Sequence, residues 1–129
     1  MYIKKLKHVI SNDDRKGSLF VKVDRFIALS DTYNRRDLLE ILLVDKHRVM
    51  IRYSLLPKYY IKEVDGRVKI SKTGDTNVFR MLKKDNGKYA FISDTSKLAL
   101  TVDENRDIIL TKYKKSNVAQ EFTVECINI

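Results

Sequence analysis

Residues 88–124, KYAFISDTSKLALTVDENRDIILTKYKKSNVAQEFTV, decide the fold that the sequence predicts. They contain four short apolar runs, at residues 89–93, 98–102, 108–111 and 122–124. Polar segments rich in Asp, Asn, Ser and Lys separate the runs, and each run is too short for a helix. The stretch therefore predicts four β-strands joined by turns.

The same order of runs recurs twice in the preceding part of the chain. Three isoleucines, Ile10, Ile51 and Ile92, are spaced 41 residues apart both times. A repeat of this period predicts three copies of one supersecondary unit. The other recurring positions are Val23-Asp24, Val64-Asp65 and Val102-Asp103; Phe26-x-Ala28, Val68-x-Ile70 and Ile108-x-Leu110; and Leu39-x-Ile41, Phe79-x-Met81 and Phe122-x-Val124.

Three units of four strands predict an all-β fold, a β-trefoil of twelve strands in three pseudo-repeated four-stranded units. Each unit lends two strands to a six-stranded barrel and two to a hairpin cap. We expect a single domain, residues 1–129, with units at roughly 1–44, 45–84 and 85–129. The residues expected in the core are Ile10, Ile51, Ile92, Phe79, Met81, Phe122 and Val124.

Local signals support most of this assignment. Asp65-Gly66 and Asn86-Gly87 are strong hairpin-turn signals. Residues 34–43 alone would favour a short helix, because Leu, Glu and Arg are good helix formers. Their repeat partners favour a strand, so we expect a strand at residues 34–43, with a short helix as the alternative.

The composition indicates a globular protein with an anionic partner. The 129 residues carry a formal net charge of +9 and one cysteine, Cys126. Excess positive charge favours nucleic acid, a sulfated polysaccharide or an acidic lipid surface, although lysine also confers solubility. No apolar run is long enough to span a membrane, and residues 1–14 lack a signal-peptide cleavage site. With no disulfide framework, we expect a cytoplasmic protein that is monomeric outside its complex.

The sequence carries no constellation typical of an enzyme. It has no Gly-x-Ser-x-Gly, Walker or Gly-x-Gly-x-x-Gly motif. The two histidines, His8 and His47, have no further ligand at metal-binding spacing. We therefore expect no catalytic residues, no metal and no cofactor.

Residues 59–68, YYIKEVDGRV, and 97–103, KLALTVD, resemble the hairpins of fibroblast growth factors and fascins. The pattern is similar to that of the β-trefoil superfold, closest to fibroblast growth factor, interleukin-1 and fascin-like trefoils. The absence of tryptophan argues against a ricin-type sugar site, which has a Gln-x-Trp in each unit. The resemblance implies a polyanion site in the third unit, formed by Lys112, Lys114, Lys115, Asn117 and Gln120.

Further basic residues extend the candidate polyanion-binding set. They are Lys4, Lys5, Lys7, Arg35, Arg36, Lys83 and Lys84. Tyr33, Tyr59 and Tyr113 stand close to basic residues, as base-stacking contacts would. A compact patch of third-unit and N-terminal lysines would favour a glycan, basic residues all round would favour RNA, and an exposed apolar face would favour a protein partner.

The main functional hypothesis is a non-enzymatic basic module that binds RNA or a ribonucleoprotein such as the ribosome through loop lysines and arginines. One alternative is a growth-factor-like or interleukin-1-like ligand that binds a receptor and a sulfated glycan. Another alternative is a fascin-like protein-interaction module that binds actin.

Overall fold

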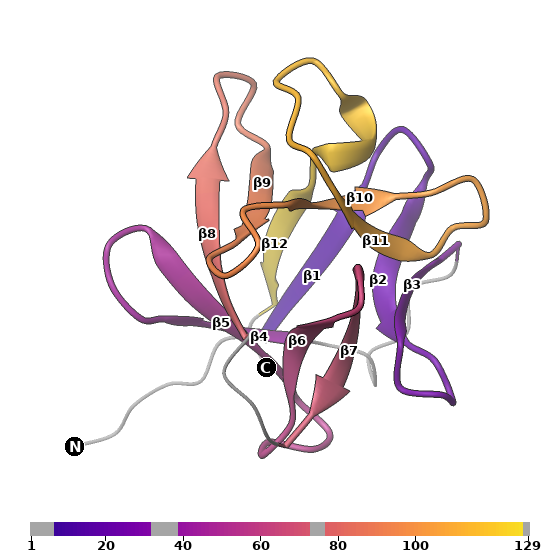
Figure 1. The fold of residues 1–129 in the computed structure, drawn as a ribbon, viewed down its shortest axis with the longest axis vertical. Coiled ribbons are helices and arrows are strands. Elements are labelled where there is room, and N and C mark those ends of the chain that lie inside the picture. The colour runs from indigo at the N-terminus through magenta and orange to yellow at the C-terminus, as the bar shows by residue number, and fades with distance from the viewer. Residues whose placement is uncertain (1–6, 32–38, 73–76, 128–129) are drawn as a thin grey trace.

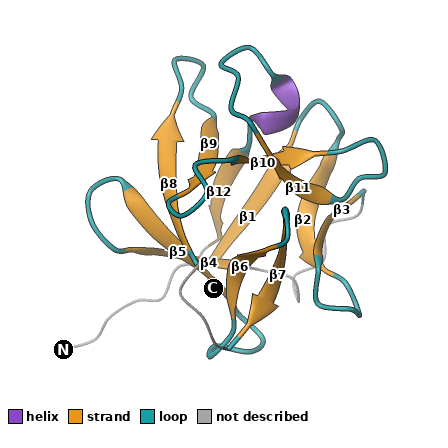
Figure 2. Cartoon of the chain, in the orientation of Figure 1, coloured by secondary structure: helices purple, strands orange, loops and turns teal. Residues whose placement is uncertain are grey.

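The computed structural model describes residues 7–31, 39–72 and 77–127, and the regular secondary structure of these residues is almost entirely β-strand (Figures 1 and 2). A short 3-10 helix, η2 (Val118–Gln120), precedes the last strand. The described residues contain no helix that is long and apolar enough to cross a membrane. The strands are β1 (Lys7–Asn12), β2 (Gly17–Val21), β3 (Ile27–Ser30), β4 (Leu39–Leu43), β5 (Arg48–Tyr53), β6 (Tyr60–Val64), β7 (Arg67–Ser71), β8 (Val78–Lys83), β9 (Tyr89–Ser93), β10 (Ala99–Val102), β11 (Ile108–Thr111) and β12 (Thr123–Ile127).

Six of the strands close into a ring. β1 pairs with β12 and β4, β4 pairs with β5, β5 pairs with β8, and β8 pairs with β9. Tyr89 in β9 and Phe122, just before β12, close the ring by exchanging two backbone hydrogen bonds of 2.8 Å. Closure leaves no open edge, so the backbone groups of the ring are paired with one another.

The other six strands form three hairpins, β2–β3, β6–β7 and β10–β11. A carbonyl oxygen at each hairpin turn accepts a hydrogen bond from a strand amide of the next unit. The first unit contacts the second, the second contacts the third, and the third contacts the first in the same way, so the units are related by a threefold axis. The fold is therefore the β-trefoil that the sequence predicts. The three hydrogen bonds join Arg25 O to Ile70 N at 2.9 Å, Gly66 O to Leu110 N at 2.8 Å, and Arg106 O to Leu29 N at 2.8 Å.

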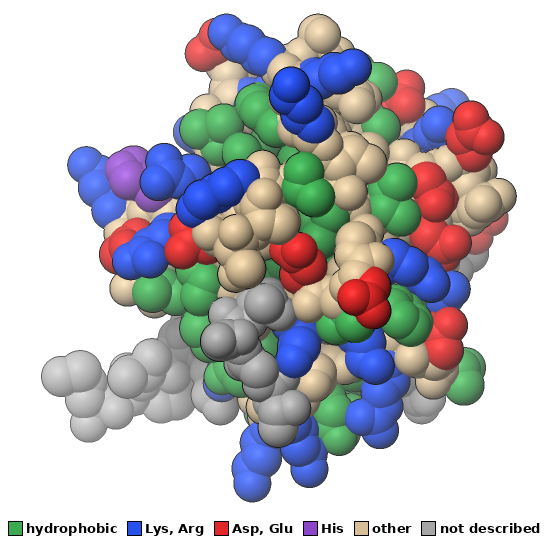
Figure 3. Space-filling model, viewed as in Figure 1, with side chains coloured by type: hydrophobic (Ala, Val, Ile, Leu, Met, Phe, Trp, Pro, Cys, Tyr) green, Lys and Arg blue, Asp and Glu red, His purple; other side chains and the backbone are tan. Residues whose placement is uncertain are grey.

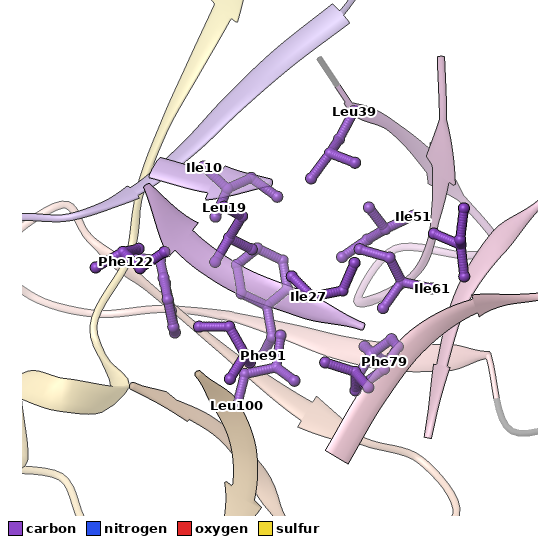
Figure 4. Packing of buried hydrophobic residues seen from close by; sticks show 14 of the residues in the cluster. Ile10, Leu19, Ile27, Leu39, Ile51, Ile61, Phe79, Phe91, Leu100 and Phe122 are labelled. Atoms are coloured by element: carbon purple, nitrogen blue, oxygen red, sulfur yellow. The ribbon is translucent and has the colours of Figure 1, made fainter. Parts of the chain in front are cut away.

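The core is formed by apolar side chains from all three units, which point toward one another (Figure 4). Leu39, Phe79 and Phe122 occupy equivalent positions and are buried, as the repeat predicts. The rings of Phe91 and Phe122 meet edge to face, with centroids 6.0 Å apart. Met81 and Val124 are only partly buried and pack against this core.

Ile92 was expected in the core, but it is only partly buried. Phe91 takes its place, because the buried residues of β1, β5 and β9 include Ile10, Ile51 and Phe91. Side chains alternate between the two faces of a strand, so a shift of one residue exchanges the face. The repeat is therefore Ile10, Ile51 and Phe91.

The first hairpin also differs from the expected register. β2 ends at Val21, and Val23, which was expected to end it, is fully exposed in the following turn. Ile27 and Leu29 are buried in the positions assigned to Phe26 and Ala28, and Phe26 is only partly buried. The counterpart of Val102 is therefore Val21 and not Val23, because each ends its strand and five residues separate it from the next strand, which begins at Ile27 or Ile108.

Two local predictions concern the Asp65-Gly66 turn and residues 34–43, for which strand and helix were considered. Asp65 and Gly66 form a two-residue hairpin turn with φ angles of 50° and 78°, as a type I′ turn requires. Residues 39–43 form β4, so this part of the ambiguous segment is a strand. Residues 34–38 lie outside the described residues.

Candidate functional site

The long loop between β11 and β12 is held by the side chain of Gln120, which is completely buried. Its Nε2 donates to the hydroxyls of Thr101 (3.1 Å) and Thr111 (3.0 Å). Nε2 also donates to Lys112 O (2.9 Å), and Oε1 accepts from Lys114 N (2.9 Å). Gln120 therefore fixes the loop from inside and is not available as the anion contact that the resemblance implied.

Two asparagines hold the rest of this loop. Asn12 Nδ2 donates to the carbonyl oxygens of Val118 (3.0 Å) and Glu121 (2.9 Å). Asn117 Oδ1 accepts from Ala119 N at 3.0 Å and so caps η2. Polar side chains thus fix the loop at both ends, which presents its remaining residues in one arrangement.

A groove of about 480 Å3 lies between this loop and the β8–β9 turn. We call it the Tyr113 groove. It brings together residues that are about 30 positions apart in the sequence, from the second and third units. Its lining residues are Leu82, Lys83, Lys84, Asp85, Asn86, Tyr113, Lys115 and Glu121.

An ion pair lies in this groove. Lys84 Nζ donates to Glu121 Oε2 and to Lys115 O, both at 2.7 Å. The side chains of Lys84 and Glu121 are only 7% and 12% exposed. Asn86 Nδ2 donates to the same carboxylate oxygen at 3.0 Å. The hydrogen bond from Lys84 lowers the pKa of Glu121, so the charge of Lys84 is balanced and not free for a polyanion.

The accessible side chains of the groove offer a different chemistry. Lys83, Lys115 and Asp85 are exposed. Tyr113 is partly exposed, and Lys84 Nζ lies 5.9 Å from the centroid of its ring. An aromatic ring flanked by cations and hydrogen-bonding groups suits a polar ligand with an apolar face.

A second groove of about 400 Å3 adjoins the first, and we call it the His47 groove. Leu82 and Lys83 line both grooves, so the two grooves form one continuous surface. Its wall includes the β4–β5 turn, where Asp45 Oδ1 accepts from the backbone N–H of His47 at 3.0 Å. The lining residues are Leu43, Lys46, His47, Val49, Met81, Leu82, Lys83 and Tyr89.

The structure gathers only part of the predicted site. Lys83, Lys84 and Lys115 line the Tyr113 groove, and the exposed Lys112 and Lys114 belong to the loop beside it. Lys7 begins β1, whose opposite end contacts that loop through Asn12, so it lies away from the groove. Lys4, Lys5, Arg35 and Arg36 lie outside the described residues.

Sequence reasoning missed Leu82, Asp85, Asn86 and Glu121. The Asn86-Gly87 turn signal predicted a hairpin but gave no indication of what the turn faces. Figure 3 shows Lys and Arg side chains at several edges of one face, with Asp and Glu between them. Among the residues that the structure describes, no three His, Cys, Asp or Glu side chains are grouped to hold a metal ion.

Comparison with known proteins identifies the fold. No family model matches the sequence, and no curated protein matches it. Among solved structures, the chain is similar to ThreeFoil, a designed threefold symmetric protein, with a TM-score of 0.80, 13% identity, and 92% of this chain and 96% of that chain covered. It is also similar to SeviL bound to the asialo-GM1 saccharide, with a TM-score of 0.77, 14% identity, and coverage of 94% and 97%.

A third similar structure is the GlcNAcα1-4Gal-releasing endo-β-galactosidase from Clostridium perfringens. The TM-score is 0.83 and the identity 10%, and the match covers 95% of this chain. It covers 33% of the enzyme, so the chain spans about a third of that protein. At these identities the three similarities establish the β-trefoil fold.

Proposed function

We propose that the chain is a non-enzymatic glycan-binding module whose Tyr113 groove binds an oligosaccharide bearing sulfate or carboxylate groups. The observation that carries this proposal is that Tyr113 lines the same groove as the exposed Lys83 and Lys115, and that this groove has a fixed polar framework. Ligand sites combine an apolar surface with a few placed polar groups, and this groove has both.

Each group in the groove has a role toward such a ligand. The ring of Tyr113 packs against the C–H face of a sugar ring, and the carboxylate of Asp85 accepts hydrogen bonds from sugar hydroxyls. Lys83 and Lys115 bind the acidic groups as point charges. Because Lys83 also lines the His47 groove, a longer oligosaccharide can continue there.

The structural neighbours support a glycan over other anions. SeviL is bound to a saccharide, and the Clostridium perfringens protein is an endo-β-galactosidase. The growth-factor-like alternative from the sequence, in its sulfated-glycan part, is therefore favoured over the RNA hypothesis. Binding to RNA or the ribosome, to a receptor or to actin stays a prediction.

Isothermal titration calorimetry tests the proposal with a heparin-derived oligosaccharide and an uncharged galactose-containing one. We expect Tyr113→Ala to weaken binding of the sulfated ligand by about tenfold or more, because an aromatic anchor is lost. Lys115→Gln should weaken binding of the sulfated ligand but not binding of the uncharged one. The matched control is Lys16→Gln, which removes an exposed charge from the β1–β2 turn.

Equal affinity of Tyr113→Ala and the parent chain would overturn the proposal. An equal loss for Lys115→Gln and Lys16→Gln would show that the charge acts generically. Titration of a single-stranded RNA in the same way distinguishes the RNA-binding hypothesis from glycan binding. If RNA binds and depends on Lys115 but not on Tyr113, the loop is a phosphate site and not a glycan site.

A further inference from the structure

A second basic surface lies where the β2–β3 turn (residues 22–26) meets the β5–β6 loop (residues 54–59) and β7. Arg25 Cζ lies 4.9 Å from the ring centroid of Tyr59, which joins the turn to the loop. Phe26 pairs with Lys69 of β7 through an isolated backbone bridge. We call this region the cap surface. None of its residues lines the Tyr113 or the His47 groove.

Aromatic rings hold the cations of the cap surface in place. Lys72 Nζ lies 5.4 Å from the centroid of Tyr59. Arg67 Cζ and Lys69 Nζ lie 4.1 and 5.4 Å from the centroid of Phe26. A ring attracts a cation through its quadrupole and leaves the positive charge in place.

Among the described residues, carboxylates pair with Lys22 and Arg67 of the cap surface but not with its other cations. Lys22 Nζ lies 3.3 Å from Asp107 and 3.7 Å from Asp24. The ion pairs of the described residues do not involve Arg25, Lys69 or Lys72. Arg67 has a long contact with Asp107, at 3.7 Å. The cap surface is therefore positively charged and ordered at once.

Aliphatic side chains project beside these cations. Val23 at the tip of the β2–β3 turn is fully exposed, and Leu55 and Leu56 in the β5–β6 loop are 54% and 41% exposed. Tyr59 N donates to Leu56 O at 2.8 Å, so the loop has a defined conformation. At the lower edge of Figure 3, Lys and Arg side chains surround hydrophobic ones.

We propose that the cap surface binds the surface of an anionic lipid bilayer, with Val23 and Leu55 entering the headgroup region. Arg25, Lys69 and Lys72 then contact lipid phosphate and carboxylate groups, whose negative surface potential attracts basic segments. Apolar side chains flanked by cations suit this interface, since one part enters the acyl boundary and the other stays among the headgroups.

The same features disfavour a nucleic acid at this place. A phosphate backbone gains nothing from an exposed valine or leucine, and bases stack on free aromatic faces. Here cations lie over the rings of Phe26 and Tyr59. The inference does not depend on glycan binding, because the two surfaces share no residue.

A tryptophan reporter tests insertion directly, because the chain contains no tryptophan of its own. Val23→Trp should shift its fluorescence to shorter wavelength with vesicles of phosphatidylcholine and phosphatidylserine, and brominated lipid should quench it. The matched control is Val118→Trp, which replaces an exposed valine on η2. An unchanged Val23→Trp spectrum on vesicles that sediment the protein would overturn insertion.

Vesicle co-sedimentation tests the charges. Arg25 has a φ of 73°, a conformation that glycine adopts freely, so Arg25→Gly removes the cation without disturbing the turn. We expect Arg25→Gly combined with Lys72→Gln to reduce binding to phosphatidylserine vesicles by about tenfold. Lys16→Gln leaves binding unchanged.

Three outcomes would overturn the proposal. They are absence of binding to phosphatidylserine vesicles, equal binding to pure phosphatidylcholine, and equal losses in the double variant and Lys16→Gln. A single-stranded RNA distinguishes the competing partner. If the double variant loses RNA binding while Val23→Ser keeps it, and vesicles do not bind, the cap surface is a phosphate-backbone site.

Discussion

The Tyr113 groove and the cap surface both contain ordered cations, but they order them in opposite ways. In the groove, Lys84 is almost buried and donates to the carboxylate of Glu121. On the cap surface, Arg25 lies over the ring of Tyr59 and remains exposed. A carboxylate cancels the charge that it fixes, whereas an aromatic ring fixes a cation that keeps its charge.

This difference separates cations that stabilise the fold from cations that remain exposed at the surface. Lys84 stabilises the groove, whereas Lys83 and Lys115, which line the same groove, are exposed. A count of lysines and arginines treats all of these residues alike. Substitutions that affect folding in one region and only binding in the other therefore test the comparison.

The largest effect is expected at Gln120. Gln120→Ala leaves Lys114 N and Lys112 O without their buried partner, and each such group costs about 1–3 kcal/mol. We expect the free energy of unfolding to fall by about 3 kcal/mol, measured by urea denaturation. Glycan binding should weaken as the loop loosens, while vesicle binding by the cap surface should persist. Loss of both together would refute the independence of the two regions.

Glu121→Gln should have the next largest effect. It leaves the charge of Lys84 without its counter-charge, and a hydrogen bond to a charged group contributes about 1.5–3 kcal/mol. We expect a loss of about 2 kcal/mol at neutral pH. Because the pKa of Glu121 is lowered in the folded protein, the unfolded chain binds its proton first as pH falls below about 4.5.

The stabilisation by Glu121 is therefore complete above that pH and is lost as pH falls through the folded pKa. Thermal unfolding of the parent chain and Glu121→Gln across acidic pH measures this. The difference between them should shrink with falling pH. A difference that is the same at every pH would show that the Lys84 pair is not its source.

A smaller effect compares two turns related by the threefold axis. Arg25 and Arg106 occupy equivalent positions with φ angles of 73° and 65°. Arg106 Nη1 donates to Arg15 O at 2.6 Å, whereas Arg25 lies on the ring of Tyr59. Replacement by glycine relieves about 1 kcal/mol of left-handed strain in both turns.

Arg106→Gly also loses a charge-assisted hydrogen bond, so we expect it to be about 1 kcal/mol less stable than the parent chain. Arg25→Gly loses an exposed contact with the ring and hydroxyl of Tyr59, of about 0.5–1 kcal/mol, which the relief of strain offsets. Calorimetric unfolding of both variants measures the contrast. Equal destabilisation would mean that the contact of Arg25 with Tyr59 stabilises the fold as strongly as the hydrogen bond from Arg106 to Arg15 does.

The sequence predicts the trefoil well because the same pattern of apolar residues occurs in three units that fold in the same way. Leu39, Phe79 and Phe122 are buried as expected, since each follows the same pattern of strands. At Phe91 and Ile92, two apolar residues are adjacent, so alternation alone does not decide which one faces inward.

The site is predicted less well for a physical reason. The groove joins Asn86 to Glu121, which are 35 residues apart, and no local pattern reports such a contact. Gln120 and Lys84 have the residue types of ligand contacts, but their side chains point into the protein. The direction of a polar side chain in a loop depends on tertiary partners that sequence spacing does not reveal.

The smallest effect concerns the Tyr59 hydroxyl and leaves stability unchanged. Its pKa is lowered by a hydrogen bond from Arg25, and the charges of Arg25 and Lys72 add to this. Since the cation favours the phenolate, Arg25→Gly should raise the pKa toward the ordinary value of 10. Ultraviolet absorbance measured during alkaline titration of the parent chain and the variant resolves this tyrosine by difference. Arg106→Gly is the control, and a matching change in that variant would show that the lowered pKa of Tyr59 does not come from its contact with Arg25.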